Sequence, residues 1–286
     1  MARWSRMIFA SVGTVVILLI LALWIGARRQ QDALSAQVDR LIHAAATAPA
    51  EAAGRQGLDA VPDPVARYLR WALRTEEHIQ EVRIRQIGTI RTDVRSERWM
   101  PFEAEHIVIP PATGFVWNAR VRVAPLLHVR VRDALIEGHG SGQVSLLLAF
   151  TVSADAATPE MNSGSLHRYL AEAVWYPTAL LPSPILRWTA IDATRALATL
   201  TDHDVSVSLE FRFAETGEVT GIYTPARWGK FPEGYRQVPW EGHFRDYLEQ
   251  DRILVPTDAD VGWYVDNEWR AVWKGRITAF QPRTER

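Results

Sequence analysis

Four arginines in two neighbouring segments have the type and spacing needed to bind anions. They are Arg120, Arg122, Arg130 and Arg132. In each segment the two arginines alternate with apolar residues, and alternate side chains of a strand point to one face of a sheet. Guanidinium groups bind phosphate and carboxylate groups through paired hydrogen bonds. The simplest interpretation is a solvated ladder of salt bridges. The alternative is a ligand-binding platform for anionic lipid headgroups or another acidic partner.

The apolar residues of these segments predict how the strands pair. Residues 102–109 and 115–123 flank a turn, and pairing Phe102 with Val123 brings apolar side chains together. A slip of one residue would set apolar against polar side chains. This register places Glu103 opposite Arg122, and the next hairpin places Arg120 opposite Arg132. We expect the guanidinium groups to repel one another unless a carboxylate or an external anion lies among them.

A second set of candidate ligand-binding residues lies at the end of a predicted helix. The set is Glu172, Trp175 and Tyr176. The helix follows Ser165, and the prolines after Tyr176 end it. The simplest role of Glu172 is an ion pair with Arg168, one turn earlier. Its aromatic neighbours would also raise the pKa of its carboxyl, as in a general acid. The helix and its following loop either pack into a core or form a lid over an apolar cavity.

The composition and the motifs exclude several kinds of site. The chain has no Cys, which excludes disulfides, thiolate zinc sites and iron–sulfur clusters. Its formal net charge of -1 gives no reason to expect nucleic-acid binding. The sequence contains no His-Glu-x-x-His, P-loop or Gly-x-Ser-x-Gly motif. We therefore predict no catalytic residue, no metal site and no cofactor, and an enzyme is the less favoured class.

The N-terminus has the features of a membrane anchor. Residues 7–27 form 21 positions without a charge. As a helix this segment would be roughly 32 Å long, against about 30 Å for the hydrocarbon core of a bilayer. Trp4 and Trp24 lie near its ends, where aromatic rings favour the interface. We predict that residues 1–27 are a transmembrane signal anchor in the inner membrane, with the bulk of the chain on the periplasmic side; a cleaved signal peptide is the alternative.

The rest of the chain predicts a linker and one β-rich domain. Residues 28–60 are rich in Ala, Gln and Gly, which indicates a stalk or linker. An amphipathic helix follows over residues 64–74. From residue 81 onward the apolar period is 2, most clearly over 205–213, which predicts antiparallel strands with one apolar face. We predict a mainly β (α+β) fold for residues 61–286: a large antiparallel, half-barrel-like sheet with one or two packed helices.

Several stretches carry resemblances to known families. Residues 99–105, 129–133 with 137–140, 168–182 and 273–278 resemble an uncharacterised bacterial family of membrane-anchored proteins. This resemblance covers residues 60–282 and implies a domain of unknown function. Residues 244–247 followed by 253–256 are similar to the late hairpin of the LolA-like lipoprotein carriers, although Asp251-Arg252 stands where these have Asp-Gly. That similarity implies a half-open β-barrel that holds acyl chains against an inner helix.

Together these observations favour a non-enzymatic, membrane-anchored envelope protein. Its expected ligand is a lipid, a lipoprotein or another hydrophobic molecule. The first alternative is a protein-interaction or scaffold module with a filled core. The second is an envelope hydrolase, which requires Glu172, His139 or Asp133 to converge in a cleft. The pattern predicts no oligomeric state.

Overall fold

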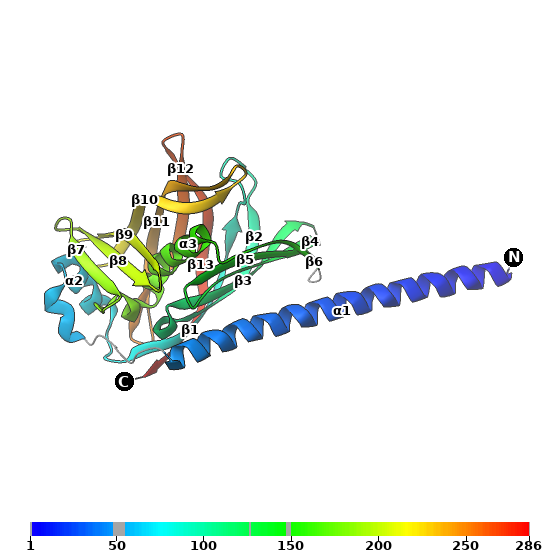
Figure 1. Cartoon of the computed structure of the whole chain (residues 1–286), viewed down its shortest axis with the longest axis horizontal. Helices are drawn as coiled ribbons and strands as arrows, with labels where there is room; N and C mark the ends of the chain where they lie inside the picture. The colour runs from blue at the N-terminus through cyan, green and yellow to red at the C-terminus, as the bar shows by residue number, and fades with distance from the viewer. Residues whose placement is uncertain (1, 48–54, 126, 147–149, 286) are drawn as a thin grey trace.

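The computed structural model describes residues 2–47, 55–125, 127–146 and 150–285 (Figure 1). Its helical segments are α1 (Ala2–Thr47), η1 (Arg55–Ala60), α2 (Asp63–Ala72), η2 (Pro110–Ala112), α3 (Pro159–Glu172), η3 (Ala173–Trp175) and η4 (Pro177–Leu180). Its strands are β1 (His78–Ile90), β2 (Met100–Ile109), β3 (Gly114–Ala124), β4 (Leu127–Ile136), β5 (His139–Leu146), β6 (Phe150–Ala156), β7 (Leu186–Ala190), β8 (Arg195–Asp202), β9 (Val205–Phe213), β10 (Val219–Phe231), β11 (Gly234–Gln250), β12 (Ile253–Val265) and β13 (Glu268–Glu285).

The strands of the described residues form one 13-stranded sheet. Its order is β6-β5-β4-β3-β2-β1-β13-β12-β11-β10-β9-β8-β7, and neighbouring strands pair antiparallel. The sheet therefore consists of two meanders that the pairing of β1 with β13 joins. Figure 1 shows the sheet curving around α3, which contacts β4 and β5 on one side and β9 and β10 on the other. This confirms the predicted half-barrel-like antiparallel sheet with packed helices.

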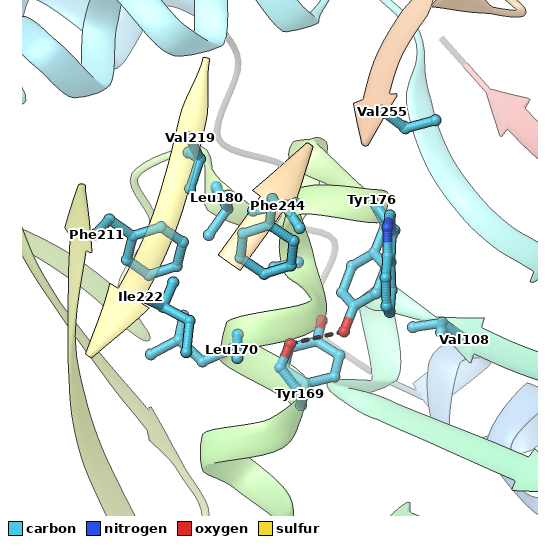
Figure 2. Close-up of a cluster of buried hydrophobic side chains, with 14 of the residues drawn as sticks. Val108, Tyr169, Leu170, Tyr176, Leu180, Phe211, Val219, Ile222, Phe244 and Val255 are labelled. Atoms are coloured by element: carbon cyan, nitrogen blue, oxygen red, sulfur yellow. Dashed lines mark hydrogen bonds between the residues drawn. The ribbon is translucent and has the colours of Figure 1, made fainter. Parts of the chain in front are cut away.

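The concave side of the sheet is filled by apolar side chains. Figure 2 shows Tyr169 and Leu170 of α3 facing Phe211, Ile222 and Phe244 from three strands. All five side chains are buried. The 3₁₀ segments after α3 belong to the same core. The structure thus favours the core-packing alternative for this helix over a lid.

The second half of α1 packs on the opposite, outer face of the sheet. Leu34, Val38 and Leu41 are buried there against residues of β2, β3 and β4. Arg132 donates hydrogen bonds to the backbone O and to Oε1 of Gln30, over 2.8 and 3.1 Å. The first half of α1 projects beyond the β-domain (Figure 1). The predicted stalk is therefore helical up to Thr47, while residues 48–54 lie outside the described part.

The predicted transmembrane span lies within α1. The side chains of residues 1–12, 15, 16 and 19 lie outside the described part of the chain. In the part that is described, no helix combines the length and the apolarity that crossing a bilayer requires.

Both predicted hairpin registers are wrong by two residues. Phe102 pairs with Val121 instead of Val123, and Arg120 pairs with Arg130 instead of Arg132. In the first hairpin, η2 and the left-handed residue Thr113 complete the turn in four residues, so Ile109 pairs with Gly114 and the second strand begins earlier than predicted. In the second hairpin an irregularity after Arg122 displaces the pairing. A shift of two keeps each side chain on its predicted face.

Candidate functional site

A groove of about 610 Å³ lies on the outer face of the sheet. It is lined by residues of β1 to β4, β12 and β13. Arg120 and Arg122 of β3 reach this face because they alternate with the core residues Ala119 and Val121. We call the groove the basic groove, after its basic residues Arg120, Arg122, His128, Lys274 and Arg276.

The basic groove carries an excess of positive charge. It contains four permanently charged cations and two carboxylates, Glu103 and Asp258, so the excess is four minus two, or two charges. In the part of the chain that the structure describes, no carboxylate lies within 4.0 Å of the guanidinium of Arg120 or Arg122. Arg276 is 3.7 Å from Asp258, a loose ion pair. Two arginines are therefore available for an external anion.

Other side chains fix the shape and the chemistry of the groove. Nη2 of Arg120 is 3.4 Å from Nδ1 of His128. The ammonium of Lys274 lies 5.0 Å above the ring of Trp99, a cation–π contact that holds it at the rim. Ile87 and Pro101 add apolar surface, and Ile87 is 45% exposed. The groove can contact both a charged group and a short apolar segment.

The two remaining arginines of the predicted platform lie outside the basic groove. Arg132 is buried beneath α1, where it binds Gln30. Arg130 is half-buried and donates to Oδ1 of Asn118 over 3.4 Å. Burial, and then the charge of Arg120, lowers the pKa of Arg130. Burial and the charge of Arg130 lower the pKa of Arg132. The four arginines share the outer face, but α1 divides them.

The other predicted residues lie on the inner face. Glu172 belongs there to a group that we call the Arg168 cluster: the fully buried His106 and the partly exposed Asp133, Arg168 and Glu172. The predicted ion pair is present, with Nε of Arg168 donating to Oε1 of Glu172 over 2.9 Å. Nη1 of Arg168 also donates to Oδ2 of Asp133, over 2.8 Å. The guanidinium lies 4.9 Å from the ring of Trp117. One arginine thus joins α3 to β4 and forms ion pairs with two carboxylates.

Burial dominates the protonation chemistry of the Arg168 cluster. It raises the pKa of Glu172 and of Asp133, although Arg168 opposes both shifts. Burial, and then the charge of Arg168, lowers the pKa of His106 well below its usual value. Trp175 and Tyr176 are buried beside the cluster and hydrogen-bond to the backbone carbonyls of Pro256 and Tyr169. These two aromatics therefore serve the core.

The predicted ligand-binding residues do not form one site, because the sheet separates them. Asp133 and Glu172 converge, as the hydrolase alternative requires, but His139 is exposed and contacts the carbonyl of Glu137. The sequence reasoning did not select His106 or Lys274, because strand pairings distant in the chain position them. Within the described ranges, no group of three or more His, Asp or Glu side chains is placed to bind a metal ion.

Comparisons with known proteins complete the description. No curated protein matches the sequence. Among solved structures, the fold is similar to that of the LolA superfamily protein NE2245 from Nitrosomonas europaea, with a TM-score of 0.42 and 9% sequence identity. The similarity covers 80% of this chain and 94% of that chain. Residues 59–281 match the model of a family of unknown function, DUF6920, and the chain therefore belongs to that family.

Proposed function

We propose that the protein is a non-enzymatic envelope protein that binds amphiphilic molecules with anionic headgroups, and that the basic groove is the binding site. The observation that carries this proposal is the pair Arg120 and Arg122, which lack carboxylate partners in the described chain and lie in a groove with two excess positive charges. Arginine binds phosphate bidentately. The volume of about 610 Å³ falls within the usual range of ligand sites.

The projecting half of α1 supports a location beside a lipid surface. Among its described side chains, large apolar ones are exposed and include Ile17, Leu18, Leu21 and Trp24. Arg28 lies 5.7 Å from the ring of Trp24, a combination of aromatic and basic residues that favours the boundary of a bilayer. We propose that α1 anchors the chain at the inner membrane, with the β-domain on the periplasmic side. A lipid would then reach the basic groove from the adjacent membrane.

The filled core supports a second candidate function. Because side chains occupy the concave side of the sheet (Figure 2), a ligand buried there would have to displace α3. A module with a filled core would use its outer face alone, to bind another protein. The two functions differ in whether the basic groove binds lipid. A short-chain anionic lipid binds there if the first function is right and does not bind if the second is right.

Binding of short-chain lipids to the full-length chain in a non-ionic detergent tests the proposal. The probes are dihexanoylphosphatidylglycerol and, as the uncharged comparison, dihexanoylphosphatidylcholine, measured by calorimetry. We expect the anionic lipid to bind more tightly. Arg120→Gln with Arg122→Gln should weaken its binding at least tenfold, because each charge-assisted hydrogen bond contributes about 1.5–3 kcal/mol.

The matched control is Arg187→Gln with Arg236→Gln. Both of these arginines are exposed, they lie on β7 and β11, and the change in net charge is the same. The control should bind as the wild type does. Equal affinity for the two lipids, or equal losses in the two double variants, would refute the basic groove as the site.

A further inference from the structure

His106 is a buried histidine that forms no hydrogen bond with the part of the chain that the structure describes. Its side chain has no exposed surface, and its ring lies edge-on to Phe115 and Trp175, with centroids 5.5 and 6.3 Å away. Within the described part of the chain, neither ring nitrogen forms a hydrogen bond. A buried, unpaired imidazole destabilises a fold unless a nearby group supplies the missing hydrogen bond.

The polar atom that faces His106 belongs to Glu172. Oε2 of Glu172 is 3.4 Å from Nε2 of His106, whereas Oε1 accepts the hydrogen bond from Arg168. Oε2 is itself buried and forms no hydrogen bond to the described residues. A carboxylate oxygen is an acceptor, and so is Nε2 of a neutral imidazole whose own proton is on Nδ1. In that tautomer, a proton on Oε2 of Glu172 makes the two atoms a donor and an acceptor at this separation.

The charges around the pair are close to balance in either protonation state. Arg168 and Arg227 are the cations, Asp133 is the other carboxylate, and Tyr176 is the nearby phenol. With Glu172 ionised, the two arginines balance the two carboxylates; with Glu172 protonated, one positive charge remains. The hydroxyl of Tyr176 donates to the carbonyl of Tyr169 and does not compete for the proton.

We propose that Glu172 and His106 form an internal proton-binding site, in which one proton shared between Oε2 and Nε2 connects α3 to β2. The site would make the packing of α3 in the half-barrel sensitive to pH. Its proton sits on the inner face of the sheet, so the proposal is independent of the anion binding proposed for the outer groove.

The direction of the pH effect follows from burial. Burial raises the pKa of Glu172 in the folded chain above its value in the unfolded chain. A carboxyl with a raised folded pKa contributes stability below its unfolded pKa, and this contribution is lost as pH rises through the folded pKa. Burial lowers the pKa of His106 well below its usual value, so the ring stays neutral at the pH values where Glu172 titrates. The wild type should therefore take up a proton on folding above the ordinary pKa of glutamate.

Urea unfolding of the full-length chain across pH tests the site. Glu172→Gln keeps the size of the side chain, an acceptor for Arg168 and a donor for His106, but it cannot titrate. Above the ordinary pKa of glutamate, the unfolding constant of the wild type should rise with pH relative to that of Glu172→Gln, by at most tenfold per pH unit, until pH passes the raised folded pKa. Glu215→Gln, an exposed glutamate in the turn before β10, is the control and should follow the wild type.

Histidine NMR on the folded chain gives a second readout. With ¹⁵N-labelled histidine, we expect His106 to remain a neutral ring over this range and its Nε2 resonance to move in Glu172→Gln. An Nε2 resonance that does not respond to Glu172→Gln would overturn the proposal. Parallel pH profiles of the wild type and Glu172→Gln would overturn it as well.

Discussion

Replacing Arg168 with Met should destabilise the fold by about 3 kcal/mol, because Arg168 is the cation that compensates two carboxylates inside the half-barrel. Methionine retains much of the apolar stem but removes the guanidinium. Its removal breaks the hydrogen bonds to Glu172 and Asp133, over 2.9 and 2.8 Å. It also removes the cation–π contact with Trp117.

The magnitude follows from the burial of each partner. Breaking a buried ion pair from one side costs about 3–5 kcal/mol, because an uncompensated charge remains. The side chain of Glu172 is 16% exposed and takes this penalty, either as an uncompensated charge or as the cost of protonating it. That of Asp133 is 36% exposed and is largely screened by solvent. Burial and repulsion by Arg168 lower the pKa of Arg227 to about 10. Removing Arg168 therefore also removes an unfavourable repulsion between the two guanidinium groups. These opposing effects place the expected loss at the lower end of the range.

The assay is urea unfolding of the full-length chain at neutral pH, followed by the fluorescence of its 12 Trp residues. The exposed Arg187→Met is the control, with an expected change below about 0.5 kcal/mol. Adding Glu172→Gln to Arg168→Met should restore part of the loss, because it removes the carboxylate left unpaired. A loss below about 1 kcal/mol for Arg168→Met, or no recovery in the double variant, would refute the role of the Arg168 cluster.

Two further predictions concern the outer face. Leu41 of α1 is fully buried against the sheet, so Leu41→Ala should weaken the docking of α1 by about 2–5 kcal/mol; faster hydrogen exchange over residues 30–45, with the strands unchanged, would confirm it. Nδ1 of His243 lies 2.7 Å from Asp260, which raises the pKa of His243, and its contribution to stability is therefore lost as pH rises through the folded pKa. Because the side chain of His243 is 34% exposed, its contribution to stability should be below about 1 kcal/mol. The wild type should therefore have a slightly higher urea midpoint at about pH 5.5 than at about pH 8.5, and His243→Gln should remove this contribution. Equal pH responses of the wild type and His243→Gln would contradict the prediction.

The local elements that follow from periodicity could be predicted from the sequence. The alternating run 205–213 is β9 at both ends, and the predicted helix 64–74 is α2 over Asp63–Ala72. The start of α3 was predicted too late, at Ser165. The helix begins at Pro159, after the N-cap Thr158, whose side chain accepts a hydrogen bond from the N–H of Met161. That cap followed by proline is a signal that the sequence contains.

Alternation does not predict β5, because packing selects its residues. The strand begins at His139, after a turn in which Glu137 and Gly138 have positive φ. A Cβ on Gly140 would lie 2.5 Å from the backbone oxygen of Met161. Glycine is therefore required where α3 approaches β5. A glycine in a strand usually indicates a close approach of this kind, but only the fold identifies what approaches.

The two candidate sites are separate because alternate residues of a strand face opposite sides of the sheet. The predicted faces are correct although the predicted registers are wrong, because a shift of two residues keeps each side chain on its face. In β4, Arg132 points outward to α1 while Asp133 points inward to Arg168. Adjacent residues thus belong to different sites. Segments distant in the chain complete each site: β13 brings Lys274 to the basic groove, and α3 brings Glu172 to His106. The sheet and its close-packed core separate the basic groove from the Glu172–His106 pair. Substitutions in the basic groove should therefore leave the pH profile of unfolding unchanged, and Glu172→Gln should leave anion binding unchanged.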